Sequence, residues 1–233
     1  MNHLSLSTPV ARTAVYVGPS LAGAPLPPLP GVEWRPPIRR GDLPQALREG
    51  RFREIVILDG EFGQSLAVSV AEIREALVKG LTVVGAASMG ALRAVDCQRL
   101  GMHGVGWVFE RFRAGALTSD DEVALLFDPW TWEPQTIPLV NLRWTTELAV
   151  ERGIVDASEG PDVVAILGAI NYRERSMGEM HAATRRAGAE PAAKVLQLLE
   201  SEPLACDRKR LDAQRALALL DTPSRRDADD ANA

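Results

Sequence analysis

Leu81-Thr-Val-Val-Gly85-Ala-Ala-Ser-Met-Gly90-Ala-Leu-Arg-Ala94 is the stretch of sequence that decides the fold. The apolar run Leu81–Val84 predicts a buried strand. The small residues after it predict a tight turn, and the residues from Met89 onward predict a helix. Such a strand–turn–helix places the Ser88 hydroxyl at the carboxyl edge of a sheet, beside the positive end of a helix. The stretch is a relative of the Gly-x-Ser-x-Gly nucleophile elbow, with alanine at the first glycine. Ser88 is therefore a nucleophile, a helix N-cap, or both.

The surrounding sequence repeats this alternation of strand and helix. Apolar runs at Ala14–Val17 and Glu54–Leu58 predict further buried strands. Amphipathic segments at Asp42–Glu49 and Leu66–Leu77 predict surface helices. This order favours an α/β fold with a Rossmann-like parallel sheet core flanked by helices.

From Leu139 onward the segments read as helices, without further strand signals. We therefore expect a C-terminal helical region after the α/β core. The polar end of the chain predicts disorder, because it has almost nothing apolar to bury. The expected division is a core over 13–143, the helical region over 144–221 and a disordered tail over 222–233.

Composition narrows the function classes. The 233 residues contain 26 basic and 31 acidic side chains, a net charge of −5, and no basic stripe for nucleic acid. We expect the densest basic run, Asp207–Arg210, and the acidic trio Asp120–Glu122 to be solvated. The two cysteines, Cys97 and Cys206, have neither metal-ligand spacing nor a disulfide pattern. Without a signal peptide or a membrane-length apolar run, we expect a cytoplasmic protein that uses no metal and no cofactor.

Several blocks, in order, resemble the TfuA-like core domain over roughly Thr13 to Arg143. They are Val17-Gly-Pro-Ser-Leu21, Arg35-Pro-Pro-Ile-Arg-Arg-Gly-Asp42, Asp59-Gly-Glu-Phe62, the Ser88 stretch, Gly101-Met102, Gly104-Val-Gly106 and Asp120-Asp-Glu-Val123. The resemblance implies a partner of a YcaO enzyme in thioamidation of a peptide backbone. It also implies hydrolysis of the C-terminal thiocarboxylate of a ubiquitin-like sulfur-carrier protein, which releases sulfide.

The partners implied are therefore a YcaO protein, the carrier and, through YcaO, a peptide substrate, with self-association as a further expectation. Neither nucleic acid nor membrane is expected. A second interpretation is a non-catalytic adaptor that binds YcaO and helps engage substrate or carrier.

The family site is a serine–lysine pair, which matches Ser88 as the nucleophile. The lysine is absent from its expected place, since Ala71 stands where family members commonly carry it. The general base is thus left open, with Asp59, at the end of a strand, and His103 as substitutes. Catalytic candidates are Ser88 and Asp59. Candidates for substrate binding are Arg40, Asp42, Gln64, Met89, Gly90 and Arg93.

Four members of that binding set have a chemical reason to bind an anion. Amide groups near Met89 and Gly90 would stabilise an oxyanion at the start of the helix. Arg40 and Arg93 stay protonated, so they would bind a carboxylate or an oxyanion instead of acting as bases.

Overall fold

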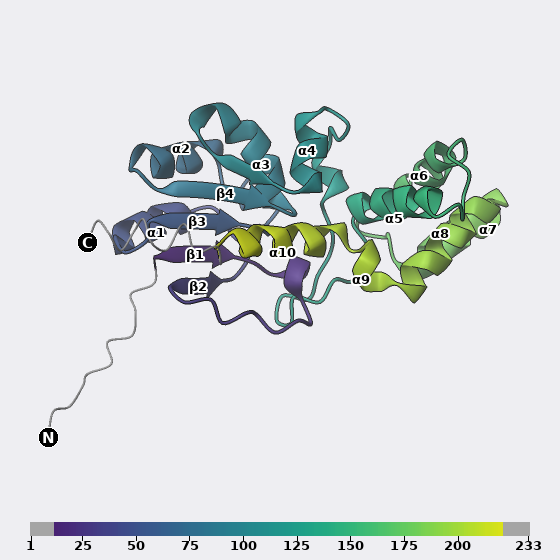
Figure 1. The fold of residues 1–233 in the computed structure, drawn as a ribbon, viewed down its shortest axis with the longest axis horizontal. Helices are drawn as coiled ribbons and strands as arrows, with labels where there is room; N and C mark the ends of the chain where they lie inside the picture. The colour runs from purple at the N-terminus through teal and green to yellow at the C-terminus, as the bar shows by residue number, and fades with distance from the viewer. Residues whose placement is uncertain (1–11, 221–233) are drawn as a thin grey trace, which may run out of the picture.

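The computed structural model describes residues 12–220, which form a parallel five-stranded sheet with helices on both faces (Figure 1). The strand order is β2-β1-β3-β4-β5, and every neighbouring pair is parallel. This confirms the predicted Rossmann-like α/β class. The strands are β1 (Thr13–Tyr16), β2 (Val32–Arg35), β3 (Glu54–Ile57), β4 (Thr82–Ala86) and β5 (His103–Val105). The predicted tail, 222–233, lies outside the described residues.

Three connecting helices share one face of the sheet, because the chain steps in one direction from β2 to β5 through crossovers of one hand. They are α1 (Asp42–Glu49), α2 (Val70–Val78) and α3 (Met89–Cys97). Successive side chains of β3 point to opposite faces of the sheet, and each face has its own apolar cluster. Ile55 and Ile57 pack in the cluster with these helices, whereas Val56 and Leu58 pack in the cluster on the other face.

Two glycines allow α3 to lie directly on the strands. A side-chain carbon at Gly90 would overlap the Ile57 carbonyl, and one at Gly85 would overlap the backbone of Gly90. The spacing of these glycines in the sequence therefore reflects a close contact between helix and sheet. That contact fixes the start of α3, and with it Ser88, against the end of β3.

The second face of the sheet is covered by the last helix, α10 (Arg208–Leu220). Figure 1 shows α10 lying lengthwise over the strands. Asp212 anchors it, because its fully buried carboxylate accepts hydrogen bonds from the amides of Trp107 at 3.0 Å and Val108 at 2.7 Å. These amides begin α4 (Trp107–Arg113), so a carboxylate from one helix caps the positive end of another.

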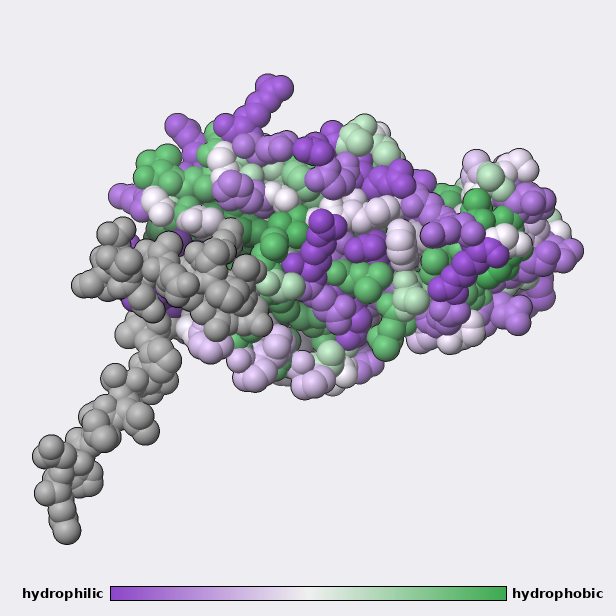
Figure 2. All heavy atoms as spheres, viewed as in Figure 1, coloured by the Kyte–Doolittle hydropathy of each residue, from purple (hydrophilic) through white to green (hydrophobic). Residues whose placement is uncertain are grey.

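The helical region has its own apolar core, which runs in sequence from Leu139 to Cys206. Its helices are α5 (Leu139–Glu151), α6 (Gly160–Gly168), α7 (Met177–Ala187), α8 (Glu190–Ser201) and α9 (Pro203–Cys206). Apolar side chains appear on the surface of this region among polar ones (Figure 2). Helix α10, which falls within the predicted helical region over 144–221, packs its apolar side chains against the sheet and also contacts α5 and α9. Between residues 12 and 220, no helix is both long and apolar enough to cross a bilayer.

Asp212→Ala tests the attachment of α10. The substitution leaves two buried amides and Arg208 without their acceptor, so we expect the free energy of unfolding to fall by about 3–5 kcal/mol. Urea denaturation monitored by circular dichroism measures this. Asp162→Ala, at an exposed position in the first turn of α6, is the control, with an expected loss below about 1 kcal/mol. Equal losses in the two variants would contradict the anchoring role.

Candidate active site

The turn that carries Ser88 is strained and buried. Ala87 has a φ of 64°, in the left-handed region that side-chain-bearing residues rarely adopt. Strain of this kind persists only where the surroundings enforce it, and it is concentrated at functional sites. Ser88 occupies the N-cap position of α3, yet its side chain makes no capping hydrogen bond. Its hydroxyl instead donates to the carbonyl oxygen of Val123 at 3.5 Å.

The loop that supplies the Val123 carbonyl is held by two arginines from outside the sheet. The 3₁₀ turn η3 (Asp120–Glu122) precedes Val123. Glu122 is buried and accepts two hydrogen bonds from Arg143 of α5, at 2.9 and 2.8 Å. Asp121 pairs at 3.0 Å with Arg175, whose side chain is fully buried. The expectation that this acidic trio is simply solvated is therefore wrong for Asp121 and Glu122.

The side chain of Lys209 contacts the same Val123 carbonyl oxygen as the Ser88 hydroxyl. Its ammonium nitrogen Nζ lies 3.2 Å from the carbonyl oxygen of Val123, and the residue is 2% exposed. Burial lowers the pKa of Lys209, a change opposed by the negative charges of Asp59 and Asp207. The prediction of a solvated basic run at Asp207–Arg210 is wrong here, because the first turn of α10 faces the sheet and the helical region.

Asp59 completes the group from the end of β3. Its Oδ2 accepts from the amides of Gly18 and Ser20, both at 2.9 Å, and its Oδ1 accepts from the Ser20 hydroxyl at 2.7 Å. Lys209 Nζ lies 3.9 Å from Oδ1. The carboxyl ends of β1, β3 and β4 thus bring together Ser20, Asp59 and Ser88, and α10 adds Lys209 from above.

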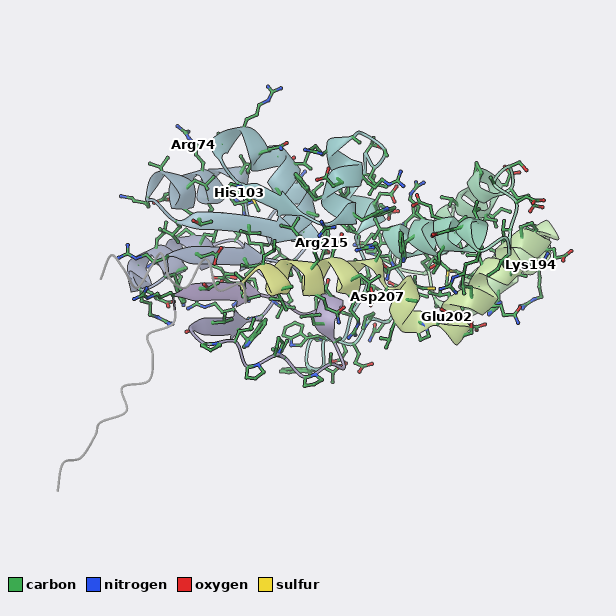
Figure 3. The ribbon with its side chains drawn as sticks, viewed as in Figure 1. Arg74, His103, Lys194, Glu202, Asp207 and Arg215 are labelled. Carbon is green, nitrogen blue, oxygen red and sulfur yellow. The ribbon has the colours of Figure 1, made fainter. Side chains whose placement is uncertain are left out.

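His103, the other two lysines and Ala71 lie away from this group. His103 begins β5 and pairs with Val84 in the middle of β4, and Figure 3 places Lys194 toward the far end of the helical region. Lys79 is exposed where α2 ends. Ala71 is exposed in the first turn of α2, a helix on the face of the sheet opposite α10.

Four of the proposed substrate-binding residues form a separate polar set around the starts of α1 and α2. Arg40 donates to the carbonyl of Gln64 at 2.8 Å. Asp42 accepts from the Arg39 amide, and Arg93 donates to the carbonyl of Val68 and pairs with Asp96. Within residues 12–220, none of these contacts reaches Ser88 or Lys209. Their role in substrate binding stays a prediction.

The two amides predicted to stabilise an oxyanion at the start of α3 differ in what they already bind. The Gly90 amide already donates to the carbonyl of Leu58, over a long 3.4 Å. The Met89 amide has no acceptor in the described part of the chain. Of the two predicted oxyanion donors, Met89 is therefore the one whose hydrogen is free for a substrate.

A cavity of about 300 Å³ reaches the site from the boundary between core and helical region. Ser20 and Lys209 line it, together with apolar walls from Leu125, Ile137 and Met177. Ser88 does not line it and is only 2% exposed. Access to the Ser88 hydroxyl therefore requires movement of the surrounding side chains or loops.

Neither cysteine belongs to the site. Cys97 is fully buried in α3, and burial raises the pKa of its thiol to about 11. Cys206 is also fully buried, with a raised pKa for the same reason. Among residues 12–220 no cluster of histidine, cysteine, aspartate and glutamate is arranged to hold a metal ion.

Comparison with known proteins identifies the family. The family model described as TfuA-like protein matches residues 59–176, half of the chain. This chain belongs to the TfuA-like family, as the sequence resemblance indicated. No curated protein matches it. The matched segment contains Asp59, Ser88 and Val123, whereas Lys209 lies beyond its end.

Sequence reasoning missed Lys209. The signal that could have found it was the count of lysines: only Lys79, Lys194 and Lys209 are present. Lys209 alone begins a helix in which leucine and alanine recur through Leu211, Ala213, Ala216 and Leu217, as they do in a buried helix.

Arg143→Ala tests whether the arginine pairs hold the Val123 loop. Loss of two charge-assisted hydrogen bonds to a buried carboxylate should cost about 1.5–3 kcal/mol of stability. Hydrogen exchange should accelerate at the amides of residues 119–125. Arg111→Ala removes an arginine whose pair with Glu147 is exposed, so it should cost less than about 1 kcal/mol. Unchanged exchange in Arg143→Ala would show that the loop does not depend on this pair.

Proposed function

We propose that this protein is a serine hydrolase that releases sulfide from the thiocarboxylate of a ubiquitin-like sulfur-carrier protein and works with a YcaO enzyme in backbone thioamidation. One observation carries the proposal. The Ser88 hydroxyl and the buried Lys209 amine both lie within hydrogen-bond distance of the Val123 carbonyl oxygen. Family membership supports the substrate and the partner, because TfuA-like proteins are associated with YcaO enzymes and with sulfur supply.

Lys209 has the properties that a base for serine needs. An amine must be neutral to accept a proton, and burial lowers the pKa of Lys209 toward that state. The two side chains can be no farther apart than the sum of their distances to the shared oxygen. Direct contact between Nζ and Oγ requires the two side chains to turn from the Val123 oxygen toward each other.

The reaction balances with these groups alone. Lys209 accepts the proton of Ser88 as Oγ bonds to the thiocarboxylate carbon, and the Met89 amide stabilises the oxyanion. When the carbon–sulfur bond breaks, the proton on Lys209 passes to sulfur and hydrosulfide leaves. Water then attacks the acyl-serine, again with Lys209 as the base. The products are the carrier carboxylate and the free enzyme.

The burial of Ser88 favours a role for a partner. A hydroxyl that is 2% exposed cannot meet the tail of another protein until the site opens. Docking of YcaO or of the carrier could supply that opening. The same observation favours the alternative function, a non-catalytic adaptor that binds YcaO and helps engage substrate or carrier while the site stays closed.

Incubation with a thiocarboxylated carrier, with and without YcaO, tests the hydrolase. We expect sulfide release that Ser88→Ala abolishes and that Lys209→Met lowers by about 10²–10⁴-fold, the usual contribution of a general base. Lys79→Met is the matched control, because this lysine is exposed and outside the site; it should release sulfide at the parent rate. Full activity of Ser88→Ala would end the nucleophile assignment.

Size-exclusion chromatography of the protein mixed with a YcaO protein from the same organism, at micromolar concentration, tests the partner. We expect a complex that elutes earlier than either protein. Complex formation without sulfide release would support the adaptor. Independent elution of the two proteins, with no change in the affinity of YcaO for its peptide, would count against both functions.

A further inference from the structure

We propose that Ser20 is a positioning residue that holds the Asp59 carboxylate away from Lys209, so that this buried pair cannot close into a tight ion pair. The proposal deepens the proposed function and rests on it only in taking Lys209 as the base. Its basis is the set of contacts that surrounds the Asp59 carboxylate.

Three donors from one short segment fix that carboxylate. The amides of Gly18 and Ser20 bind Oδ2, and the Ser20 hydroxyl binds Oδ1 at 2.7 Å. All lie in or beside the 3₁₀ turn η1 (Pro19–Leu21), which follows β1, and Ser20 is 1% exposed. Both oxygens are thus bound by groups that belong neither to α10 nor to the Val123 loop.

The distance to Lys209 shows the effect of this arrangement. Nζ lies 3.9 Å from Oδ1, whereas a closed ammonium–carboxylate hydrogen bond measures about 2.7–2.9 Å. Lys209 instead lies closer to the neutral carbonyl of Val123, at 3.2 Å. A closed ion pair between Lys209 and Asp59 would stabilise the ammonium form of Lys209. The ammonium form cannot accept the proton of Ser88.

Other charged groups near Lys209 are already engaged. Asp207, directly before α10, accepts from the Asn141 side chain and the Arg210 amide. On α10 itself, Asp212 pairs with Arg208. In the turn that precedes Val123, Glu122 pairs with Arg143 and Asp121 with Arg175. Asp59 is therefore the carboxylate whose position most directly sets the charge state of Lys209.

Removal of the Ser20 hydroxyl should release Oδ1 to Lys209. In Ser20→Ala the pair can close, which stabilises the ammonium form and raises the pKa of Lys209. In Asp59→Asn the negative charge is lost, so the pKa should fall below that of the parent protein. The two variants of one hydrogen-bonded pair are thus expected to change the titration of Lys209 in opposite directions.

Nuclear magnetic resonance of lysine carbons measures this directly, since the chain contains only three lysines. With ¹³C-labelled lysine, the Cε signal of Lys209 is assigned by its loss in Lys209→Met. We expect the titration midpoint of that signal to rise by about one pH unit in Ser20→Ala and to fall in Asp59→Asn. Ser69→Ala removes a serine that caps α2 and should leave the midpoint unchanged.

Should Ser20→Ala not fold, Ser20→Cys keeps the size of the side chain with a weaker donor and should raise the midpoint by less. A midpoint that stays fixed or falls when the Ser20 hydroxyl is removed would overturn the proposal. The titration needs no substrate, so absence of sulfide release would count against the proposed function and leave this measurement intact.

Discussion

Burial of the Lys209 amine against a carbonyl oxygen is the constraint on which the rest of the site depends. An amine taken out of water favours its neutral form, and a tight carboxylate partner would cancel that preference. In the structure, Lys209 Nζ lies 3.2 Å from the neutral carbonyl oxygen of Val123. It lies 3.9 Å from the nearest carboxylate oxygen of Asp59. Ser88 shares the Val123 oxygen, so this one carbonyl contacts both groups of the proposed reaction.

Lys209 reaches the sheet on α10, a helix that returns to the sheet after the helical region. The chain leaves the sheet after α4, forms the helical region, and comes back as α10 over the face that the crossover helices leave uncovered. Asp212 fixes α10 against the start of α4, and the arginines of the helical region fix η3. The helical region thus shapes the candidate site at a distance, through Arg143 and Arg175, and supplies neither of the two proposed reacting groups.

Short stretches of sequence predicted the strands and the turn that carry Ser88 and Asp59. The apolar runs and the turn at Ser88 gave the parallel sheet and the carboxyl-edge position of Ser88 and Asp59. The lysine count singles out Lys209, but local patterns cannot place it near Ser88, because their proximity depends on how α10 crosses the sheet more than one hundred residues later. The basic neighbours of Lys209 also resembled a solvated surface. Strand β5 was missed because three residues, two of them small or polar, carry almost no strand signal.

If Lys209 activates Ser88, covalent labelling of the Ser88 hydroxyl should depend on Lys209. The protein would be treated with phenylmethylsulfonyl fluoride across a range of pH, and the modified peptide located by mass spectrometry. We expect sulfonylation at Ser88 that becomes faster as the pH rises through the lowered pKa of Lys209, and no sulfonylation in Lys209→Met. Labelling of Ser88 at the same rate in that variant, with the same dependence on pH, would contradict this expectation.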